Sequence, residues 1–222
     1  MRLATTALAL LATGTCLIAA APPGTAEPSR AASHASGNLI RNAGAERTTP
    51  APSADGTRKV ALAHWKVAKK YRFTAVAYGT PEFLAVAAPG PDDRGKNFFT
   101  GGDSGNKSVA SQVIPLRAYA GWIKNGAHFT LSGWLGGFES QRDHAVVRVT
   151  WLNAHAKSLG SAHIGPVTVK DRRSQTQLLE RSTAGRVPHH AAQARIVVTM
   201  SRSDGSYVDG YADQLSLVLR KG

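Results

Sequence analysis

The chain has 222 residues, enough for one all-β domain with a sizeable core. Its single cysteine, Cys16, allows no disulfide within the chain, so the fold must be held by its own core, by a metal ion or by both. The formal net charge of +13 favours contact with polyanions, although a solvated basic surface explains the same balance. The basic residues form no long run and are not interleaved with aromatic residues, so specific nucleic-acid binding is not expected.

Residues 1–21 have the composition of a secretion signal. Arg2 gives a short basic start, and the uncharged run that follows ends in Ala19, Ala20 and Ala21. A basic start, an apolar middle and small residues at the end are typical of a cleaved signal, and they predict a secreted, extracellular protein. The run is also nearly long enough to be retained as a membrane anchor. No later stretch is apolar enough to cross a bilayer, so no transmembrane segment is expected after signal cleavage.

Residues 22–37 are rich in Pro, Ala, Ser and Gly and show no hydrophobic periodicity, which predicts a disordered linker. The remainder, residues 38–222, is predicted to form a single domain. It contains no repeat of fixed period, which argues against solenoids and propellers. We expect a monomer.

Short runs with β-strand character follow one another through this domain. They cover residues 38–46, 63–67, 72–78, 97–100, 111–116, 127–134, 144–151, 167–170 and 195–200, and a closing run from Ala212. Clusters of Gly, Pro, Asn and Asp separate them, and only residues 176–181 hint at a helix. Many short strands with regular turn signals predict an all-β protein, an antiparallel β-sandwich or barrel.

The closing run carries the clearest strand pattern. Leu215, Leu217 and Leu219 alternate with other residues, so that they share one face of a half-buried strand. The acidic residues Asp209 and Asp213 stand at its start, around Gly210 and Tyr211. Such a turn can close a sheet and also offer carboxylate oxygens to a hard cation such as Ca²⁺.

Alternation also separates two tryptophans. In residues 128–134, Trp134 falls on the polar side of its strand, opposite the apolar Phe129 and Leu131. In residues 144–151, Trp151 falls on the apolar side and Arg148 on the other. We therefore expect Trp151 in the core and Trp134 on an accessible face.

Several segments, taken in order, resemble one fold family. They are "NLIRNAGAE", "AHWKV", "NFFTGG", "ASQVIPL", "FTLSGWLGGF" and "YADQLSLVL". Together they resemble the galactose-binding-like jelly rolls, and they are similar to carbohydrate-binding modules of the family 4, 9 and 22 type and to lone modules of that shape in secreted actinobacterial proteins. The resemblance covers residues 38–220 and is more specific for fold than for ligand. It implies two antiparallel sheets of four or five strands with the first and last strands adjacent.

The same resemblance implies a structural calcium ion where these two strands meet. Glu46 and Asp213 match the positions whose side chains bind that ion, and Asp93 and Asn97 are weaker candidates in the loop between them. Ca²⁺ takes roughly six to eight oxygen ligands, which carboxylates, amides and backbone carbonyls can supply. The alternative is that Glu46 and Asp213 only make hydrogen bonds in turns.

Carbohydrate binding needs an aromatic ring for the apolar face of a sugar and polar groups for its hydroxyls. The candidate set on the non-core face of one sheet is Trp134, Arg148 and Gln214, and Trp122 and Tyr207 are candidates in loops. Each aromatic residue could equally be an ordinary part of a sandwich, and Arg148 could simply be solvated.

The motifs that suggest catalysis are weak. "GGDSGN" at residues 101–106 is similar to the "GDSGG" of trypsin-like serine proteases. Only His34 and His64 precede Ser104, far too closely for that scaffold, so a flexible turn is the better interpretation. The histidine spacing of a catalytic zinc site is also missing from the sequence.

The sequence therefore predicts a secreted, non-catalytic carbohydrate- or cell-envelope-binding module stabilised by calcium. The expected partner is a polysaccharide or an anionic cell-envelope glycan. One alternative is a secreted hydrolase with a dispersed active site, in which Asp143 and His144 would be the residues to test. Another is an envelope structural or protein-interaction domain with an inactive sugar face.

Overall fold

The computed structural model describes residues 34–48 and 60–222. The expected signal at residues 1–21 and residues 22–33 of the expected linker lie outside these ranges. No helix within the described ranges is long and apolar enough to cross a membrane.

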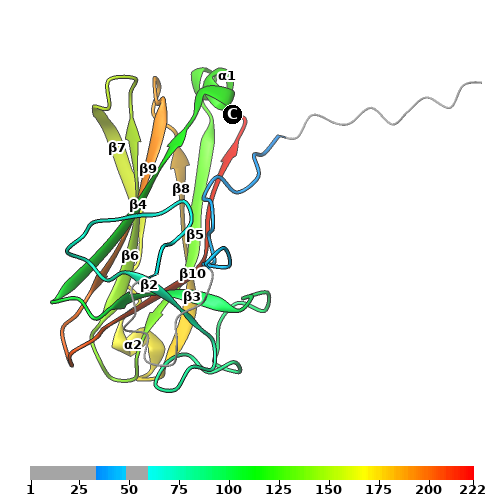
Figure 1. Cartoon of the computed structure of the whole chain (residues 1–222). Coiled ribbons are helices and arrows are strands. Elements are labelled where there is room, and N and C mark those ends of the chain that lie inside the picture. Colours follow the sequence, from blue (N-terminus) through cyan, green and yellow to red (C-terminus); the bar gives the residue numbers. More distant parts are fainter. Residues whose placement is uncertain (1–33, 49–59) are drawn as a thin grey trace, which may run out of the picture. The chain divides into compact units, whose positions relative to one another are not determined.

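Two five-stranded antiparallel sheets pack face to face (Figure 1). Sheet A has the strand order β2 (Thr74–Ala77), β3 (Asn97–Gly102), β10 (Val208–Arg220), β5 (His128–Gly137) and β8 (Gln177–Arg186). Sheet B has the order β1 (Lys66–Val67), β4 (Lys107–Pro115), β9 (Gln193–Ser201), β6 (His144–Leu152) and β7 (Ser158–Ile164). The helical elements are a 3₁₀ turn, η1 (Arg117–Tyr119), and two short helices, α1 (Ala120–Lys124) and α2 (Val169–Arg172).

From β3 to β10, successive strands lie in opposite sheets, except for β6 and β7, which follow each other as neighbours in sheet B. The order β3-β10-β5-β8 in one sheet and β4-β9-β6-β7 in the other is that of two interlocked Greek keys, which is a jelly roll. β1 and β2 extend one edge of each sheet. The all-β antiparallel sandwich expected from the sequence is thus confirmed.

The core lies between the inner faces of the sheets, because every long strand alternates as its sequence indicates. Leu215, Leu217 and Leu219 of β10 are fully buried, and Trp151 of β6 is 2% exposed with its ring centroid 5.1 Å from that of Phe129. The prediction that Trp151 belongs to the core is confirmed. Burial of such side chains is the main favourable term in folding, and it leaves only the outer faces, edges and loops for binding.

The first described residues run beside the second half of β10. β3 pairs with β10 only through Val208–Ala212, so beyond that point one side of β10 needs another partner. The amides of Ser36 and Leu39 donate to the carbonyls of Leu219 and Leu217, and the amide of Leu215 donates to the carbonyl of Ala43. The adjacency of the first segment and the closing strand is confirmed. The sequence assigned residues 34–37 to the linker, whereas in the structure they already pair with β10.

Three local expectations were wrong. Residues 167–170, expected as a strand, lead into α2, because Thr168 and Asp171 form a capping box in which each side chain accepts the other's backbone N–H. Residues 176–181, with a helical hint, lie in β8 from Gln177 on, and ten residues of this strand pair with β5. β7 was not predicted, since its mostly polar sequence lacks apolar alternation.

Candidate functional site

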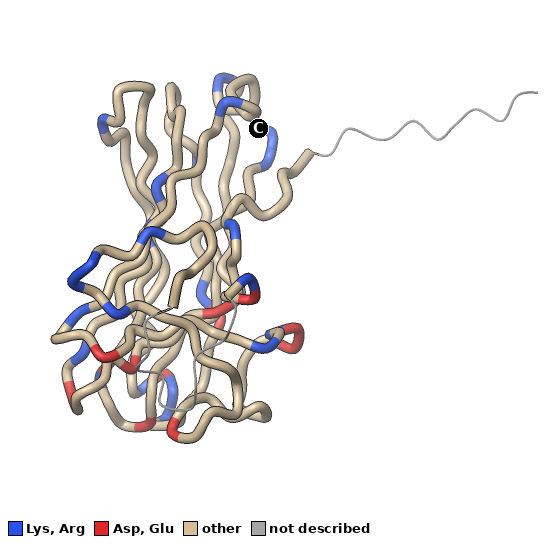
Figure 2. Tube along the Cα trace, in the orientation of Figure 1, with Lys and Arg blue, Asp and Glu red and all other residues tan. Residues whose placement is uncertain are grey.

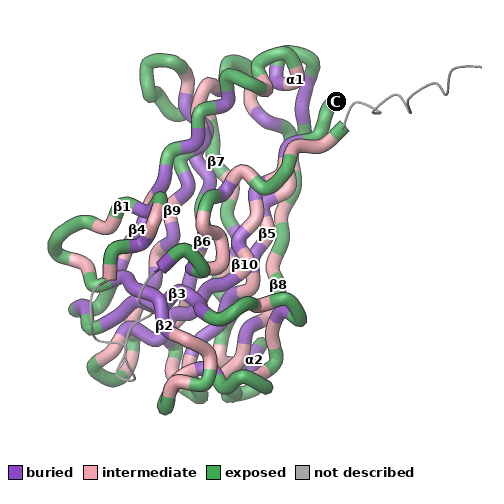
Figure 3. The backbone as a smooth tube through the Cα atoms, turned by 45° about the vertical axis from the view of Figure 1, so that its right-hand side comes forward, coloured by how far each residue is buried: buried purple, intermediate pink, exposed green. Residues whose placement is uncertain are grey.

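The outer face of sheet A is covered over one half only. A second apolar cluster of Val76, Leu84, Phe98, Leu178 and Tyr211 lies there, with Tyr78, Phe83, Ala88, Trp134 and Phe138 packed against it. The 78–96 loop supplies part of this cluster and crosses the sheet, since the amide of Leu178 on β8 donates to the carbonyl of Pro89 at 2.9 Å. β3 is consequently buried along its whole length (Figure 3).

Trp134 stands where this cover ends. It is half-buried, and its register partners are Glu180 on β8 and Asp213 on β10. Beyond it on the same face of β5 come Ser132 and Thr130, which are half-exposed and alternate with buried residues. We call the open part of this face the Trp134 surface; it comprises Thr130, Ser132, Trp134, Glu180, Ser182 and Ser216.

The surface combines one indole with a floor of small polar side chains. Ser132 is the register partner of both Ser182 and Ser216, so three hydroxyl groups lie in one row across the sheet. Glu180 adds an exposed carboxylate in the row of Trp134. Neighbouring strands in a sheet lie about 5 Å apart, so the groups in these rows offer donors and acceptors over an extended strip.

Gln214 fixes the border between this surface and the 78–96 loop. The register of β10 shifts between Asp213 and Ser216, and Gln214 has a φ of 47° there. Its side-chain amide donates to the carbonyl of Asp93 at 2.7 Å. Gln214 therefore lies next to the Trp134 surface, but one of its amide hydrogens is already engaged in holding the loop.

Asp213 is a buried carboxylate below this border. One oxygen accepts a 2.6 Å hydrogen bond from the Tyr78 hydroxyl and the other accepts one from the Gln214 amide. Burial, with a smaller contribution from the nearby charge of Glu46, raises the pKa of Asp213 to about 7. Burial, followed by the charge of Asp213, also holds the pKa of Tyr78 above its usual range.

The four residues expected to bind metal are gathered in this region. Glu46 is exposed, but one of its oxygens accepts hydrogen bonds from the amides of Lys96 and Asn97 at 2.9 and 2.8 Å. Asn97 is buried and its side-chain nitrogen lies 3.4 Å from the Ala45 carbonyl. Asp93 is exposed and contributes its carbonyl to Gln214. The hydrogen bonds of Glu46 and the bond from Tyr78 to Asp213 join segments that are distant in sequence, whereas the bond from Gln214 to Asp213 is local.

The donor chemistry of this cluster fits a calcium ion. A Cβ on Gly95 would come within 2.6 Å of the Glu46 carboxyl, and one on Gly44 within 2.9 Å of Asp213, so glycines allow the backbone to approach both carboxylates. The charge of Glu46 adds to burial in raising the pKa of Asp213, and a cation bound beside Asp213 would act in the opposite direction. Within the described residues no three His, Cys, Asp or Glu side chains form a metal-binding group, so amide and carbonyl oxygens would have to complete the ligand set.

The remaining candidates are not brought to the Trp134 surface. Arg148 lies on β6, in the other sheet, where its guanidinium donates to Ser161 at 3.2 Å; grouping it with Trp134 and Gln214 on one sheet was wrong. Trp122 lies in α1 and packs against Tyr119, with the Lys221 ammonium 5.5 Å from its ring centroid. Tyr207 precedes β10 and packs against Phe83 of the 78–96 loop.

Two neighbours of Asp213 that the 78–96 loop supplies were not predicted from the sequence. Tyr78, which bonds Asp213, and Arg94, whose guanidinium carbon is 5.1 Å from the Tyr78 ring centroid, were not singled out. Arg94 also donates to the carbonyls of Ala88 and Pro91 and so shapes the loop from within. The long Pro- and Gly-rich stretch between two strands was the available signal, because long loops in compact domains are often functional.

The pair suggested for hydrolysis has structural partners instead. Asp143 is 1% exposed, and its two oxygens accept backbone hydrogen bonds from Ser203, Asp204 and Asp209. The ring of His144 contacts the carbonyl of Arg142 at 3.0 Å. Ser104, in the protease-like motif, is buried and accepts a bond from the amide of Arg72. These groups hold loops in place.

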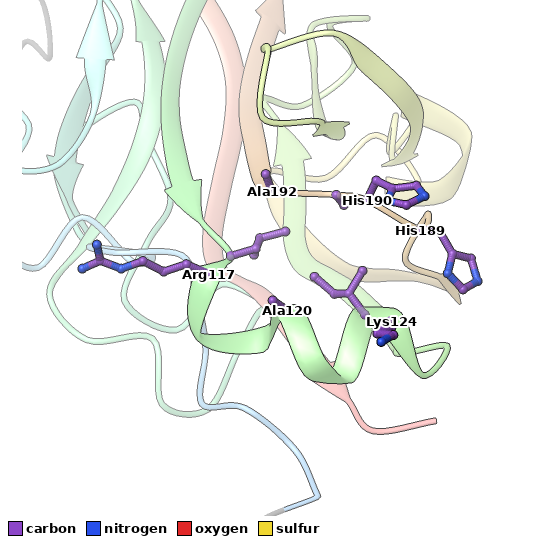
Figure 4. A pocket seen from close by; sticks show the side chains of 9 residues that line it. Arg117, Ala120, Lys124, His189, His190 and Ala192 are labelled. Atoms are coloured by element: carbon purple, nitrogen blue, oxygen red, sulfur yellow. The ribbon is translucent and has the colours of Figure 1, made fainter.

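A separate pocket of about 490 Å³ lies at the α1 end of the sandwich (Figure 4). Leu116, Ile123 and Ala191 line its apolar part, and Lys124, His189 and His190 stand at its rim. Arg117 points away from these side chains in Figure 4. None of the candidate site residues named above lines this pocket.

Comparisons with known proteins agree with the fold. Neither the known protein-family models nor the curated protein sequences include one that matches this chain. Among solved structures, the apo form of a cyclase from Fischerella sp. superposes with a TM-score of 0.55 at 12% identity, over 85% of this chain and 98% of that chain. The likeness is one of fold.

Carbohydrate-binding modules are also among the similar structures. A family 16 module gives a TM-score of 0.48 at 18% identity, over 81% of this chain and 99% of that one. The module TmCBM61, solved with β-1,4-galactotriose, gives 0.45 at 14% identity, over 82% and 98%. In the tailspike protein 4 of bacteriophage CBA120, by contrast, the chain spans only 21% of the matched enzymatically active domain.

Proposed function

We propose that the chain is a secreted, non-catalytic module that binds a polysaccharide on the Trp134 surface. One observation carries the proposal: a half-buried indole stands at the head of a strip of small hydroxyl side chains, on the open half of a sheet face whose other half is covered. An indole held by its neighbours can stack on the apolar face of a sugar ring at little entropic cost. Ser132, Ser182 and Glu180 can then bond the hydroxyl groups of the same chain.

The shape of the strip favours a polymer over a single sugar. The row of serines crosses three strands, and Trp134 lies one row away on the same face. The 78–96 loop stands as a wall at one end of the strip, so a glycan would lie against this wall and over the indole. Secretion is supported by the composition of residues 1–21.

Calcium binding is a second part of the proposal. Glu46 and Asp213 would hold the ion, with Asn97 and the carbonyl oxygens of the 93–97 segment completing the ligands. A bound Ca²⁺ would supply two positive charges beside two carboxylates. The segments that these residues belong to form the floor and wall next to Trp134, so the ion would act on the shape of the binding surface rather than on any reaction.

Replacing Trp134 tests the glycan proposal. Trp134→Ala should lower affinity for the polysaccharides that the wild-type protein binds on a glycan array by about five-fold to one-hundred-fold, because burial of an aromatic ring against a sugar is worth about 1–3 kcal/mol. Trp134→Phe should retain part of the affinity. Trp122→Ala is the matched control, since it removes a half-buried indole from the other end of the sandwich and should leave binding unchanged.

Two results would contradict the proposal. One is the absence of binding to any polysaccharide by a wild-type protein with a normal thermal transition. The other is a Trp134→Ala variant that loses stability but keeps its glycan affinity, which would make the indole a structural residue.

A further inference from the structure

The outer face of sheet B has an unusual charge distribution. The five strands of this sheet contain no Asp or Glu, but they carry Lys66, Lys107, Arg148 and Arg195, all of them exposed. Figure 2 shows the acidic segments in the half of the molecule that holds α2, away from the upper strands. We call these four residues, together with His163, the basic face.

Strand register arranges the cations in rows. Lys66 pairs with Ser111, Ser111 with Val197, Val197 with Arg148, and Arg148 with His163, so one row crosses all five strands. Arg195 lies in the next row, between Val113 and Thr150. With strands about 4.8 Å apart, Lys66 and Arg148 are separated by about 14 Å along this row.

These cations are not neutralised by neighbouring acids. Arg148 donates to the Ser161 hydroxyl, and the ion pairs within the described part of the chain, Arg142–Asp204 and Arg181–Asp171, involve none of the basic face. A shallow hollow of about 200 Å³ at the β1 edge is lined by Arg41, His64 and Lys66, and it extends the positive row beyond the sheet. Like charges held together in this way favour a ligand with several negative charges.

The uncharged part of the face narrows the choice of ligand. Val113 is 55% exposed, and Val109, Val146 and Val197 are half-buried on the same side. Trp151 is the one Trp, Tyr or Phe in the strands of this sheet, all of which are described, and it points into the core. Nucleic-acid binders that grip single strands use aromatic platforms, and duplex readers need an element that enters a groove. A flat face of valines and guanidinium groups suits an anionic sugar chain, whose rings can lie on valine while its carboxylates pair with arginine.

We propose that the basic face is a second binding surface, which takes a linear acidic polysaccharide lying across β1, β4, β9 and β6. Its anionic groups bind to Lys66, Arg148 and Arg195. The surface is on the opposite sheet from Trp134 and does not depend on the function proposed for that residue. Two faces on opposite sides of one sandwich would let the protein bridge two glycan chains.

The test uses polygalacturonate, which carries carboxylates, and the same polymer after methyl esterification, which is neutral. Titration calorimetry should show that the wild-type protein binds the acidic polymer only, and this binding should weaken as the salt concentration is raised.

The double variant Arg148→Gln with Arg195→Gln should reduce the affinity for polygalacturonate at least about ten-fold, and it should lower the slope of log affinity against log salt by about two. Lys124→Gln with Arg186→Gln removes the same charge from exposed positions elsewhere and should change affinity little. Dextran sulfate distinguishes sulfate from carboxylate as the preferred anion.

Several outcomes would overturn the proposal. Equal weakening by both double variants would mean that binding follows net charge and not this face. Loss of polygalacturonate binding in Trp134→Ala, with none in the arginine variant, would move the anionic ligand to sheet A. Tighter binding to oligo-dT or to anionic phospholipid vesicles than to either acidic polysaccharide would identify another class of partner. Melting temperatures of all variants show whether each is folded.

Discussion

Asp209 is the residue at which burial most directly ties stability to pH. It is 8% exposed and accepts a 2.8 Å hydrogen bond from the Tyr211 hydroxyl. Burial raises its pKa from an ordinary value of 3.8 to about 6, and the charges of Asp143 and Glu82 act in the same direction. The folded state therefore binds this proton more tightly than the unfolded state. Its contribution to stability is complete below about pH 4 and is lost as pH rises through about 6.

Asp209→Asn should remove this dependence. The amide oxygen can still accept from Tyr211, but it carries no charge to desolvate. We expect the variant to have a free energy of unfolding about 1–3 kcal/mol above that of the wild type at neutral pH, and a difference near zero around pH 4. Denaturant unfolding across this range measures it, and Asp103→Asn, the same change at an exposed position, is the control. A variant that is less stable than the wild type at every pH would show that the Tyr211 contact had been disturbed.

At the scale of elements, the N-terminal segment completes sheet A beside β10. The side chain of Asn38 takes part in this pairing through two hydrogen bonds. Its amide oxygen accepts one from the amide of Leu217, and its amide nitrogen donates one to the carbonyl of Leu215. Asn38→Ala should lower the free energy of unfolding by about 1–2 kcal/mol, because two backbone groups of the closing strand lose their partner. Urea unfolding measures this. Asn106→Ala, in an exposed loop, is the matched control, and an equal loss there would mean that the side-chain bridge is not what stabilises β10.

The elements also show what a sequence alone can predict. β5, β6, β9 and the end of β10 were predicted because one face of each is buried and the other is not, so their residues alternate. β8 was missed because its first residues favour a helix, and only its ten-residue pairing with β5 makes it a strand. α2 forms in a stretch with β propensity because a capping box satisfies the backbone N–H groups at the start of the helix. Local preference is outweighed where a neighbour or a cap supplies the missing hydrogen bonds.

For the candidate site, the sequence predicts which face of its strand each residue occupies, but not which residues come together. Alternation places Trp134 and Arg148 on the non-core sides of their own strands, and both placements are confirmed. It does not say which sheet a strand joins. In the jelly-roll order β5 and β10 lie in sheet A and β6 lies in sheet B, so Trp134 and Gln214 come together and Arg148 faces the opposite side. The 78–96 loop, which decides how much of sheet A is open, has no periodic pattern to follow.

At the scale of the whole molecule, the proposed calcium ion would connect three parts of the chain that are distant in sequence. Glu46 ends the N-terminal segment, Asn97 begins β3, and Asp213 lies in the closing strand. No disulfide within the chain can link these three parts, because Cys16 is the single cysteine of the sequence. A ligand that binds the folded state alone stabilises it by an amount that grows with its concentration, about 2.7 kcal/mol at one hundred times the dissociation constant.

Chelation should therefore lower the melting temperature, and added Ca²⁺ should restore it. For a domain of this size we expect a shift of about 5–10 °C in scanning calorimetry when the ion is in large excess. Asp213→Asn should abolish the shift, because it removes a carboxylate that Ca²⁺ would bind. Asp209→Asn is the matched control: it neutralises another buried acid on the same strand, outside the cluster, and should keep the full calcium response. If wild-type protein melts at the same temperature with chelator and with Ca²⁺, then Glu46 and Asp213 serve the fold through their hydrogen bonds alone, and the Trp134 surface is shaped without a metal.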